Sequence, residues 1–436
     1  MMSRHPTIRR LQSGFVVLVL GIGTLVFAEN EQSVATYPNI QEALNANPEK
    51  RLFVPAGDHI ITEKIVIRGT RSGLYGPGRI IQQRADQPII EIRNSEDVEI
   101  RDLTLARSKD QAVTDHEAIV AIQCKGLVLE NLRIIDNQTR SSAIKLRECN
   151  DSRISRCLVR NYMRLSIDDR TGSKDWGYAF NCTDGTGISV EYSVGTLIEG
   201  NRVIEDHLVP TPEIKEKHQL GKFVKKNAVK GGVTNQQTWD AEYTDAWQQG
   251  SAIIVTSPTS SDFTRIIGNH VENAAQGIDL HSDHVIVSNN VVTNAFIGMK
   301  AMHGSRNVLI TGNQFTRNSL WAIGLMPGAG SNAGNFDGGS IIANNIISDF
   351  GHGDASWIWG EERSPFKFDT GQQPDDPPLT DVIIQGNLVH AIGKPRYQYT
   401  VIIAGGENTP RGLRFSNNLF HPGTQGISNT ELPQGD

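Results

Sequence analysis

The chain has 436 residues, of which 38% are hydrophobic and 21% are charged, and its formal net charge is −6 at neutral pH. An acidic balance of this kind excludes non-specific nucleic-acid binding, which requires a basic surface. The length alone would suggest two or three domains, but a continuous repeat architecture can carry it as one unit.

The first 28 residues are typical of a secretory signal peptide. Three arginines precede the apolar stretch 14–26, and Val26-Phe27-Ala28 presents small residues where a signal peptidase cleaves. Cleavage after Ala28 would remove these arginines and leave a net charge of about −9, that is −6 less three. We therefore expect 29–436 to be a single domain that is secreted or periplasmic, monomeric and not attached to a membrane.

The mature chain begins with one helical pattern. Residues 37–48 (YPNIQEALNANP) place apolar side chains at helical spacing. We expect a short amphipathic helix that caps the open end of a repeat fold, where an uncovered strand edge would invite aggregation.

A repeat follows, made of short β-branched runs that end in Gly-Asn or Asn-Asn. Its members are 265–269, 285–290, 308–313, 341–345, 382–387 and 414–418, with an earlier one ending at Asn201 and weaker ones ending at Asp102 and Asn131. Asn269 and Asn290 are 21 residues apart, and Asn290 and Asn313 are 23 apart. This period, with no long helical pattern between the runs, predicts a β-solenoid in which the asparagines stack as a hydrogen-bonded ladder.

A second set of strands lies between the asparagine runs. Its members begin at Ala118, Ala143, Gly187, Ala252, Gly277, Gly298 and Ala322. Positions two and four of each run are apolar and are expected to point inward, so positions three and five point outward. One outward column then contains Lys145, Ser189, Ile254, Asp279, Lys300 and Gly324, and the next contains Arg147, Glu191, Thr256, His281, Met302 and Met326.

These columns bring together a carboxylate, an imidazole and an ammonium group. Asp279, His281 and Lys300 fall on two neighbouring coils, and His303 follows at the next turn. Such groups shift one another's pKa and can share a proton, which makes these four the candidate catalytic residues. The alternative is a solvated face of ordinary surface charges. Lys145, Arg147 and Glu191, on the same face, are candidate substrate-binding residues.

Four insertions interrupt the repeat, at about 161–186, 205–249, 329–338 and 360–379. Long loops of this kind are often functional, and we expect the four to form two walls of a groove over the candidate residues. The first two carry the further candidate substrate-binding residues Trp176, Tyr178, Lys225, Trp239 and Trp247. Aromatic rings beside cations suit a charged sugar, so we expect a polysaccharide as the partner.

The amino-terminal pattern resembles the pectin-lyase-like superfamily, in particular its pectate-lyase-type amino-terminal domain. Val54, Pro55, Gly57 and Ile60 match the pattern V-P-x-G-x-Y-x-I, with His59 in place of the aromatic residue, and Gly76 and Gly78 supply the following G-x-G turn. The resemblance implies an all-β fold, a single-stranded right-handed parallel β-helix. It leaves the chemistry open, because this superfamily contains lyases, hydrolases, epimerases and adhesins.

The segment 277–283 (GIDLHSD) is similar to the G-F-D-P-H-E stretch of mannuronan C5-epimerases, with Leu280 in place of the proline. The resemblance implies that Asp279 and His281 belong to an active site that removes the C5 proton of a uronate. Lys300 or Arg147 would neutralise the carboxylate and His281 would act as the base. Lys300, Tyr178 or His303 would act as the acid, and Asp279 would orient His281 or bind Ca²⁺.

Two other functions stay open. A β-helix glycoside hydrolase would use two carboxyl groups about 6.5–9.5 Å apart, for which Glu191 and Asp279 are the candidates. A non-catalytic carbohydrate-binding or surface β-helix would bind glycans without turnover. No metal-binding motif is present, and Ca²⁺ is the only cofactor we consider. Cys124 and Cys149, one coil apart, could form a disulfide or remain buried thiols.

Overall fold

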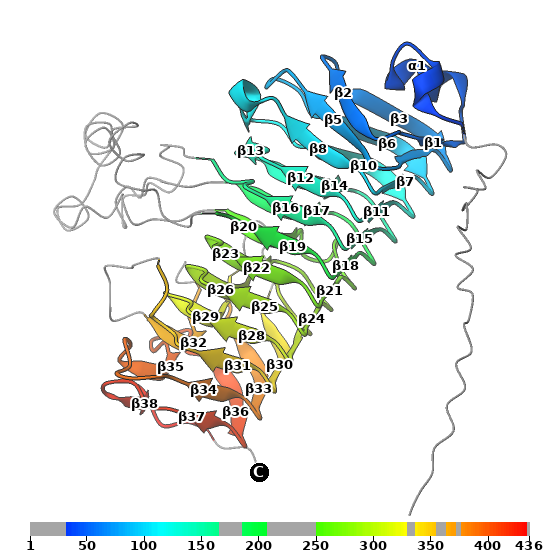
Figure 1. The fold of residues 1–436 in the computed structure, drawn as a ribbon. Helices are drawn as coiled ribbons and strands as arrows, with labels where there is room; N and C mark the ends of the chain where they lie inside the picture. The colour runs from blue at the N-terminus through cyan, green and yellow to red at the C-terminus, as the bar shows by residue number, and fades with distance from the viewer. Residues whose placement is uncertain are drawn as a thin grey trace, which may run out of the picture.

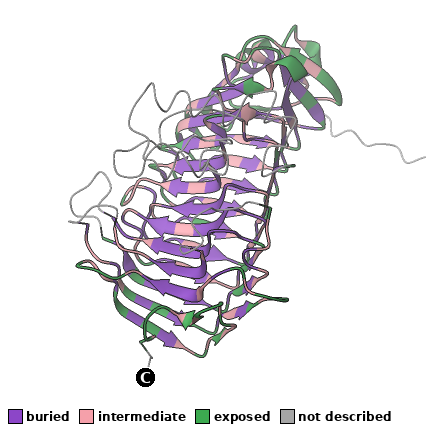
Figure 2. Ribbon diagram, turned by 90° about the vertical axis from the view of Figure 1, so that its left-hand side faces the viewer, coloured by how far each residue is buried: buried purple, intermediate pink, exposed green. Residues whose placement is uncertain are grey.

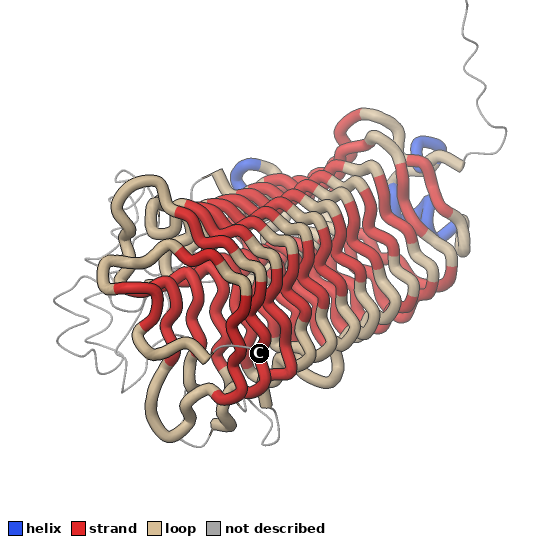
Figure 3. The backbone as a smooth tube through the Cα atoms, turned by 90° about the horizontal axis from the view of Figure 1, so that it is seen from below, coloured by secondary structure: helices blue, strands red, loops and turns tan. Residues whose placement is uncertain are grey.

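The computed structural model describes residues 32–164, 185–206, 250–328, 336–354, 363–371 and 376–433. Three parallel sheets of twelve strands each run along the whole molecule and enclose one continuous core (Figure 1). We name them sheets A, B and C. The chain passes through sheets C, A and B in turn, so that each circuit makes one coil of a parallel β-helix, and the coils stack one behind the other when seen from below (Figure 3).

Sheet A contains β1 (Arg51–Phe53), β4 (Gly73–Tyr75), β7 (Glu99–Arg101), β11 (Val128–Glu130), β15 (Arg153–Ser155), β18 (Leu197–Glu199), β21 (Arg265–Ile267), β24 (Ile286–Ser288), β27 (Leu309–Thr311), β30 (Gly338–Ala343), β33 (Thr380–Gln385) and β36 (Arg411–Ser416). Sheet B contains β2 (Gly57–Ile61), β5 (Gly78–Gln82), β8 (Thr104–Arg107), β12 (Arg133–Ile135), β16 (Leu158–Arg160), β19 (Arg202–Ile204), β22 (His270–Glu272), β25 (Val291–Thr293), β28 (Gln314–Thr316), β31 (Ile346–Ser348), β34 (Leu388–His390) and β37 (Leu419–Phe420).

Sheet C contains β3 (Ile65–Thr70), β6 (Ile90–Glu96), β10 (Ile119–Lys125), β14 (Ser142–Arg147), β17 (Thr186–Glu191), β20 (Ser251–Thr256), β23 (Gln276–Leu280), β26 (Ile297–Met302), β29 (Trp321–Met326), β32 (Ser364–Phe368), β35 (Tyr399–Ile403) and β38 (Gly426–Ser428). A small two-stranded sheet joins β9 (Val113–Thr114) to β13 (Gln138–Thr139). Short 3₁₀ turns occupy Val34–Thr36 and Lys109–Gln111.

The core is a set of apolar columns that run parallel to the axis. On sheet C, Ile188, Ile253 and Ile278 are direct neighbours in register and are fully buried. Fully burying such a side chain stabilises the fold by ~1.5–3 kcal/mol. A single coil has nothing to pack against, so this stabilisation exists only when coils stack. The buried bands cross every coil in Figure 2.

The predicted asparagine ladder is present. Asn290 Oδ1 accepts from the backbone N–H and the side-chain amide of Asn269, and Asn313 Oδ1 accepts in the same way from Asn290. The ladder continues without a break from Asn201 to Asn418 and satisfies buried amides inside the corner between sheets A and B. The two weaker repeat members, which end at Asp102 and Asn131, were aligned one residue away from the ladder position. Asp102 and Asn131 adopt positive φ at the outer corner, and leucines follow them at the ladder position.

The capping helix is α1 (Ile40–Ala46), shorter than the predicted 37–48 and capped by the Asn39 side chain. Ile40 and Leu44 are buried against the first coil. Gln41 pairs with the backbone of Val66 in both directions, donating to its C=O at 3.1 Å and accepting from its N–H at 2.7 Å. A side-chain amide therefore satisfies the first strand of sheet C, which would otherwise present open backbone groups.

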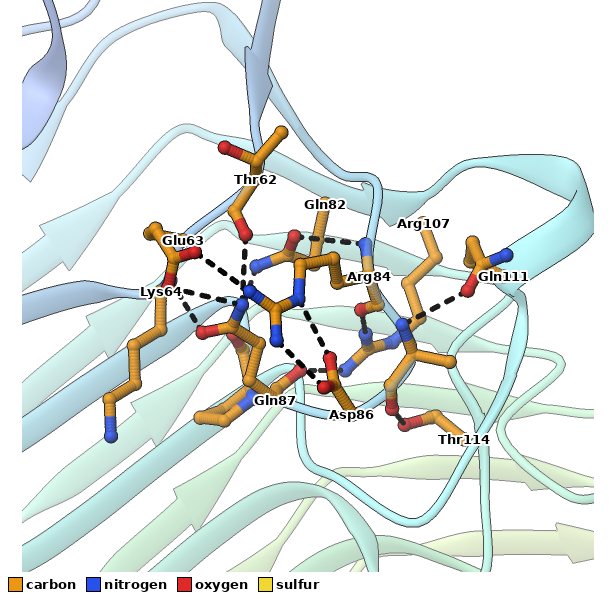
Figure 4. Close-up of polar contacts among 12 residues, drawn as sticks. Thr62, Glu63, Lys64, Gln82, Arg84, Asp86, Gln87, Arg107, Gln111 and Thr114 are labelled. Atoms are coloured by element: carbon orange, nitrogen blue, oxygen red, sulfur yellow. Dashed lines mark hydrogen bonds and ion pairs between the residues drawn. The ribbon is translucent and has the colours of Figure 1, made fainter.

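Polar side chains close the turn from sheet B to sheet C in the first coils (Figure 4). The Arg84 side chain pairs with Asp86 and Glu63. The buried Arg107 guanidinium donates to Asn137 Oδ1 and to the backbone oxygens of Arg84, Gln87 and Glu117. Desolvation by burial lowers the pKa of Arg107 to about 10, so it stays charged at neutral pH. These interactions are structural, because every donor is directed to the protein itself.

One predicted insertion is wrong in its boundaries. Residues 360–379 were expected to be a single loop, but β32 lies inside that range and pairs with β29 in sheet C. The pattern Ser-Pro-Phe-Lys-Phe was missed because Pro365 occupies the position at which the predicted runs begin with Ala or Gly. Most of the other three predicted insertions, namely residues 165–184, 207–249 and 329–335, lie outside the described part of the chain, so the groove walls stay a prediction.

Cys124, Cys149 and Cys157 are free and buried, so the open question about Cys124 and Cys149 resolves to stacked thiols. Among the described residues, no helix has the length and apolar character needed to cross a membrane. The predicted signal peptide, 1–28, lies outside the described residues.

Candidate active site

The register of sheet C is the one predicted from the sequence. Asp279 on β23 is the direct neighbour of Ile254 on β20 and of Lys300 on β26. The flanking residues Ile278 and Leu280 are fully buried in the core. Asp279 therefore projects from the outer face of sheet C, and His281, two residues later, projects on the same side.

Asp279 is the centre of a compact charged cluster. Its Oδ1 lies 3.0 Å from Nε2 of His281, and its Oδ2 lies 3.4 Å from Nζ of Lys300. Ser251 Oγ donates to the same Oδ2 at 3.3 Å. The side chain of Asp279 is only 5% exposed, whereas those of His281 and Lys300 are 23% and 15% exposed. The sequence predicted a solvent-facing carboxylate, but its outward position is covered by neighbouring side chains.

His303 completes the cluster from the turn after β26. Its ring lies edge-on to His281 with the centroids 5.2 Å apart. Three buried atoms around this point, Asp279 Oδ1, His281 Nε2 and His303 Nδ1, have no aligned hydrogen-bond partner among the described residues. The contact between Asp279 and His281 is thus close but poorly directed. Unsatisfied polar atoms that converge in this way are typical of a ligand site.

The surroundings of Asp279 and His303 shift the pKa of each group and so set its charge at neutral pH. Burial by itself would raise the pKa of Asp279, but Lys300 and His281 outweigh it and hold that pKa well below the ordinary value. Asp279 is therefore ionised at neutral pH. Burial, assisted by the charges of His281 and Lys300, lowers the pKa of His303 to about 4, so its ring is neutral. A carboxylate and a neutral imidazole in one cluster are typical of sites that transfer protons.

A buried aspartate that sequence reasoning missed holds the turn carrying His303. Asp337 accepts from the backbone N–H groups of Gly304, Ser305 and Gly328 at 2.9–3.1 Å. Burial raises the pKa of Asp337 to about 6 in spite of these three donors. Asp337 lies in the turn before β30, and the spacing between it and His303 gives no signal of their contact in the sequence.

Sequence reasoning also missed a third outward column. Each run begins with Ala or Gly, and these residues pack into the corner; the Cβ of an alanine at Gly277 would meet Val292 at 2.5 Å. The residue before each run therefore points outward, which places Ser251 and Gln276 side by side next to Asp279. The signal was available in the sequence, because the first position of every run is small.

The other candidates lie away from the cluster. Lys145 Nζ pairs with Glu191 at 2.9 Å, and Ser189 donates to the same carboxylate. Arg147 lies 3.7 Å from Glu148 and stacks over the ring of Tyr192. Glu191 is two coils from His281 in register. The candidates Trp176, Tyr178, Lys225, Trp239 and Trp247 lie outside the described residues.

Within the described ranges, no group of three or more His, Cys, Asp or Glu side chains is arranged to hold a metal ion. Both oxygens of Asp279 face cationic or proton-donating groups, at Lys300, His281 and Ser251. A Ca²⁺ ion requires six to eight oxygen ligands, which the described residues around Asp279 do not supply. Ca²⁺ binding at Asp279 therefore does not fit the donor set.

Comparison with known proteins places the fold. The family described as "Right handed beta helix region" matches residues 251–431. No curated protein sequence matches the chain. The A-module of mannuronan C-5 epimerase AlgE6 from Azotobacter vinelandii superposes with a TM-score of 0.56 at 9% identity, covering 92% of this chain and 100% of that one.

Two further solved structures are similar. A PL6 alginate lyase in complex with a trisaccharide has a TM-score of 0.55 at 11% identity, covering 89% of this chain and 78% of its own. DFA-IIIase from Arthrobacter chlorophenolicus A6, in complex with GF2, has a TM-score of 0.54 at 11% identity, covering 93% and 99%. At these identities the likeness shows the fold alone. The chain has the right-handed parallel β-helix fold that the sequence predicted.

Proposed function

We propose that the protein is a secreted carbohydrate-active enzyme that acts on an acidic, uronate-containing polysaccharide by abstracting the C5 proton. The observation that supports this most strongly is the buried, ionised Asp279, which lies within 3.4 Å of both His281 and Lys300, while the neutral ring of His303 lies edge-on to His281. The similarity in fold to an epimerase and to an alginate lyase is consistent with it.

The groups divide among the roles that this reaction requires. Lys300 supplies a cation that neutralises the uronate carboxylate and makes the C5 proton more acidic. His281 accepts that proton, and Asp279 holds the ring and stabilises the imidazolium that forms, as the aspartate does in a catalytic triad. His303 is neutral above pH ~4 and can therefore accept a proton but not supply one, so Lys300 is the group that gives a proton to the leaving oxygen or to C5.

The hydrolase alternative receives less support from this cluster. A glycoside hydrolase needs one carboxyl group that is protonated at working pH. The pKa of Asp279 is lowered rather than raised, and Glu191 is engaged by Lys145 at 2.9 Å. A non-catalytic glycan-binding role is equally compatible with the three unsatisfied atoms of the cluster, and it predicts glycan binding without turnover.

The test is a panel of polyuronates, incubated with purified protein with and without chelator and followed by ultraviolet absorbance and reducing-end release. A lyase produces ultraviolet-absorbing ends, an epimerase changes sugar composition without cleavage, and a hydrolase produces reducing ends alone. We expect one of the first two outcomes and no activity in His281→Ala. Full turnover by His281→Ala would refute the proposal.

A further inference from the structure

The corner between sheets C and A repeats one backbone conformation in every coil. The corner residue has a positive φ, between 52° and 74°, in twelve successive coils; it lies two positions before the sheet A strand in the first nine coils and at the register-equivalent position within β30, β33 and β36 in the last three. Eight of the twelve are glycine, asparagine or aspartate, which tolerate this left-handed conformation. The four exceptions are Glu49, Arg71, Phe263 and His284.

Phe263 is the exception that demands a reason. A bulky side chain at φ 61° is a true conformational outlier, and the coil register shows that glycine or asparagine serves at the same position elsewhere. Packing in the core does not offset this strain, because Phe263 is 58% exposed. An unfavourable backbone conformation at an exposed aromatic residue is typical of a functional site.

His284 holds the same position in the next coil, and the two rings lie together. Their centroids are 5.1 Å apart and their planes are inclined by 33°, which makes a nearly continuous aromatic shelf on the outer surface. The side chain of His284 is 48% exposed, and its Nδ1 lies 2.9 Å from Oδ1 of the buried Asp283. Asp283 therefore fixes the orientation of the histidine half of the shelf.

A cation and a third ring extend the shelf along the axis. Arg306, one coil further, pairs with Oδ2 of Asp283 at 2.5 Å and lies 4.6 Å over the ring of Phe336. Phe336 is 47% exposed. The group formed by Phe263, His284, Arg306 and Phe336, which we name the corner platform, thus presents aromatic faces beside a guanidinium group over several neighbouring coils.

The corner platform adjoins the charged cluster. His284 follows His281 by three residues, so the two Cα atoms are at most about 10 Å apart. Neighbouring coils are ~4.8 Å apart, which is close to the length of one sugar residue. A chain that places one residue at Asp279 therefore reaches the platform with the next one or two.

We propose that the corner platform is a subsite that binds an acidic sugar ring of the substrate beside the reacting residue. The ring stacks its apolar face on Phe263 and His284, and its carboxylate meets Arg306. This inference rests on the proposed function for the identity of the ligand. It assigns binding, and not chemistry, to these residues.

The experiment compares Phe263→Asn/His284→Asn with the matched control Arg71→Asn, which makes the same replacement at the same corner position far from the cluster. Asparagine already occupies this corner at Asn307, so the fold is expected to be retained and the melting temperature to stay equal or rise. Each protein also carries His281→Ala, so that titration with polyuronate oligosaccharides measures binding without turnover.

We expect the double variant to bind about tenfold or more weakly and Arg71→Asn to bind as the parent does. Equal affinity of the two would overturn the platform, and so would a large loss of stability in Phe263→Asn, which would assign the ring a structural role. The two proposals fail separately. Turnover by the wild type with no effect of the platform variants refutes the platform alone, whereas glycan binding that depends on the platform, without turnover, refutes the proposed reaction alone.

Discussion

Replacing Asp279 by asparagine removes one negative charge from the most buried position of the cluster while keeping its shape. The ammonium group of Lys300, 15% exposed, then loses its counter-ion, and the ring of His281 loses the carboxylate 3.0 Å from its Nε2. Breaking a buried ion pair from one side destabilises a protein by ~3–5 kcal/mol. The long 3.4 Å contact to Lys300 and the poor alignment with His281 place the expected loss at the lower end, about 3 kcal/mol.

The double variant Asp279→Asn/Lys300→Met isolates the charge effect. Removing both charges should recover most of the lost free energy of unfolding, with a coupling energy of about 1–3 kcal/mol between the two sites. Turnover should remain lost in both variants, because His281 no longer has the group that stabilises its protonated form. Denaturant titration gives the stabilities, and the polyuronate assay gives the turnover.

The lowered pKa of Asp279 predicts how the stability difference between wild type and Asp279→Asn changes with pH. The pKa of Asp279 in the folded protein lies below the value of 3.8 expected for the unfolded chain. Its stabilisation is therefore complete above pH ~4 and is lost as the pH falls through the lower folded value. The difference between wild type and Asp279→Asn should be constant from pH 7 to about 4 and shrink below. A variant as stable and as active as the wild type at pH 7 would refute the reasoning.

Three further predictions concern other groups. Burial raises the pKa of Glu205 to about 8, so the folded protein loses stability as the pH rises from 4.5 through 8 and this carboxyl group must ionise in the core. At pH 9, Glu205→Gln should therefore be more stable than wild type by an amount on the order of a few kcal/mol in thermal or urea unfolding, and equal stability would contradict this. The pKa of about 4 for His303 predicts that kcat/KM falls as pH decreases through 4, and a fall already centred near 6.5 would exclude His303 as the titrating group. Asn290→Ala removes the ladder hydrogen bonds to both neighbouring coils and should lower the free energy of unfolding by about 2–4 kcal/mol in urea titration. A loss below about 1 kcal/mol would show that these hydrogen bonds do not contribute to stability.

The fold followed from the sequence because a solenoid repeats its physical requirements. Asn269 and Asn290 mark the coil length, and alternation along each strand then fixes which residues leave the core. The same reasoning placed Asp279 next to Lys300, since a shift of one residue would have turned every side chain around. Periodic patterns carry enough information to predict periodic structure.

Contacts made by the turns were not predictable in this way. Asp337 contacts the turn of His303 from the neighbouring coil, and its neighbours in sequence give no period from which to infer the contact. The strand β32 was hidden inside a predicted loop for a similar reason, because its coil is interrupted on both sides. Phe263 reveals its strained conformation only when the register aligns it with the glycines and asparagines of the other coils.

The central claim is that Asp279, His281 and Lys300 act together to remove the proton at C5 of a uronate. Its most direct test is a polyuronate labelled with deuterium at C5, incubated with the wild type and with His281→Ala, with the label in the solvent followed over time. Release by the wild type and retention in the presence of His281→Ala are the predicted results, for a lyase and for an epimerase alike. Conversion of the polymer with the label still on its carbon would contradict the claim.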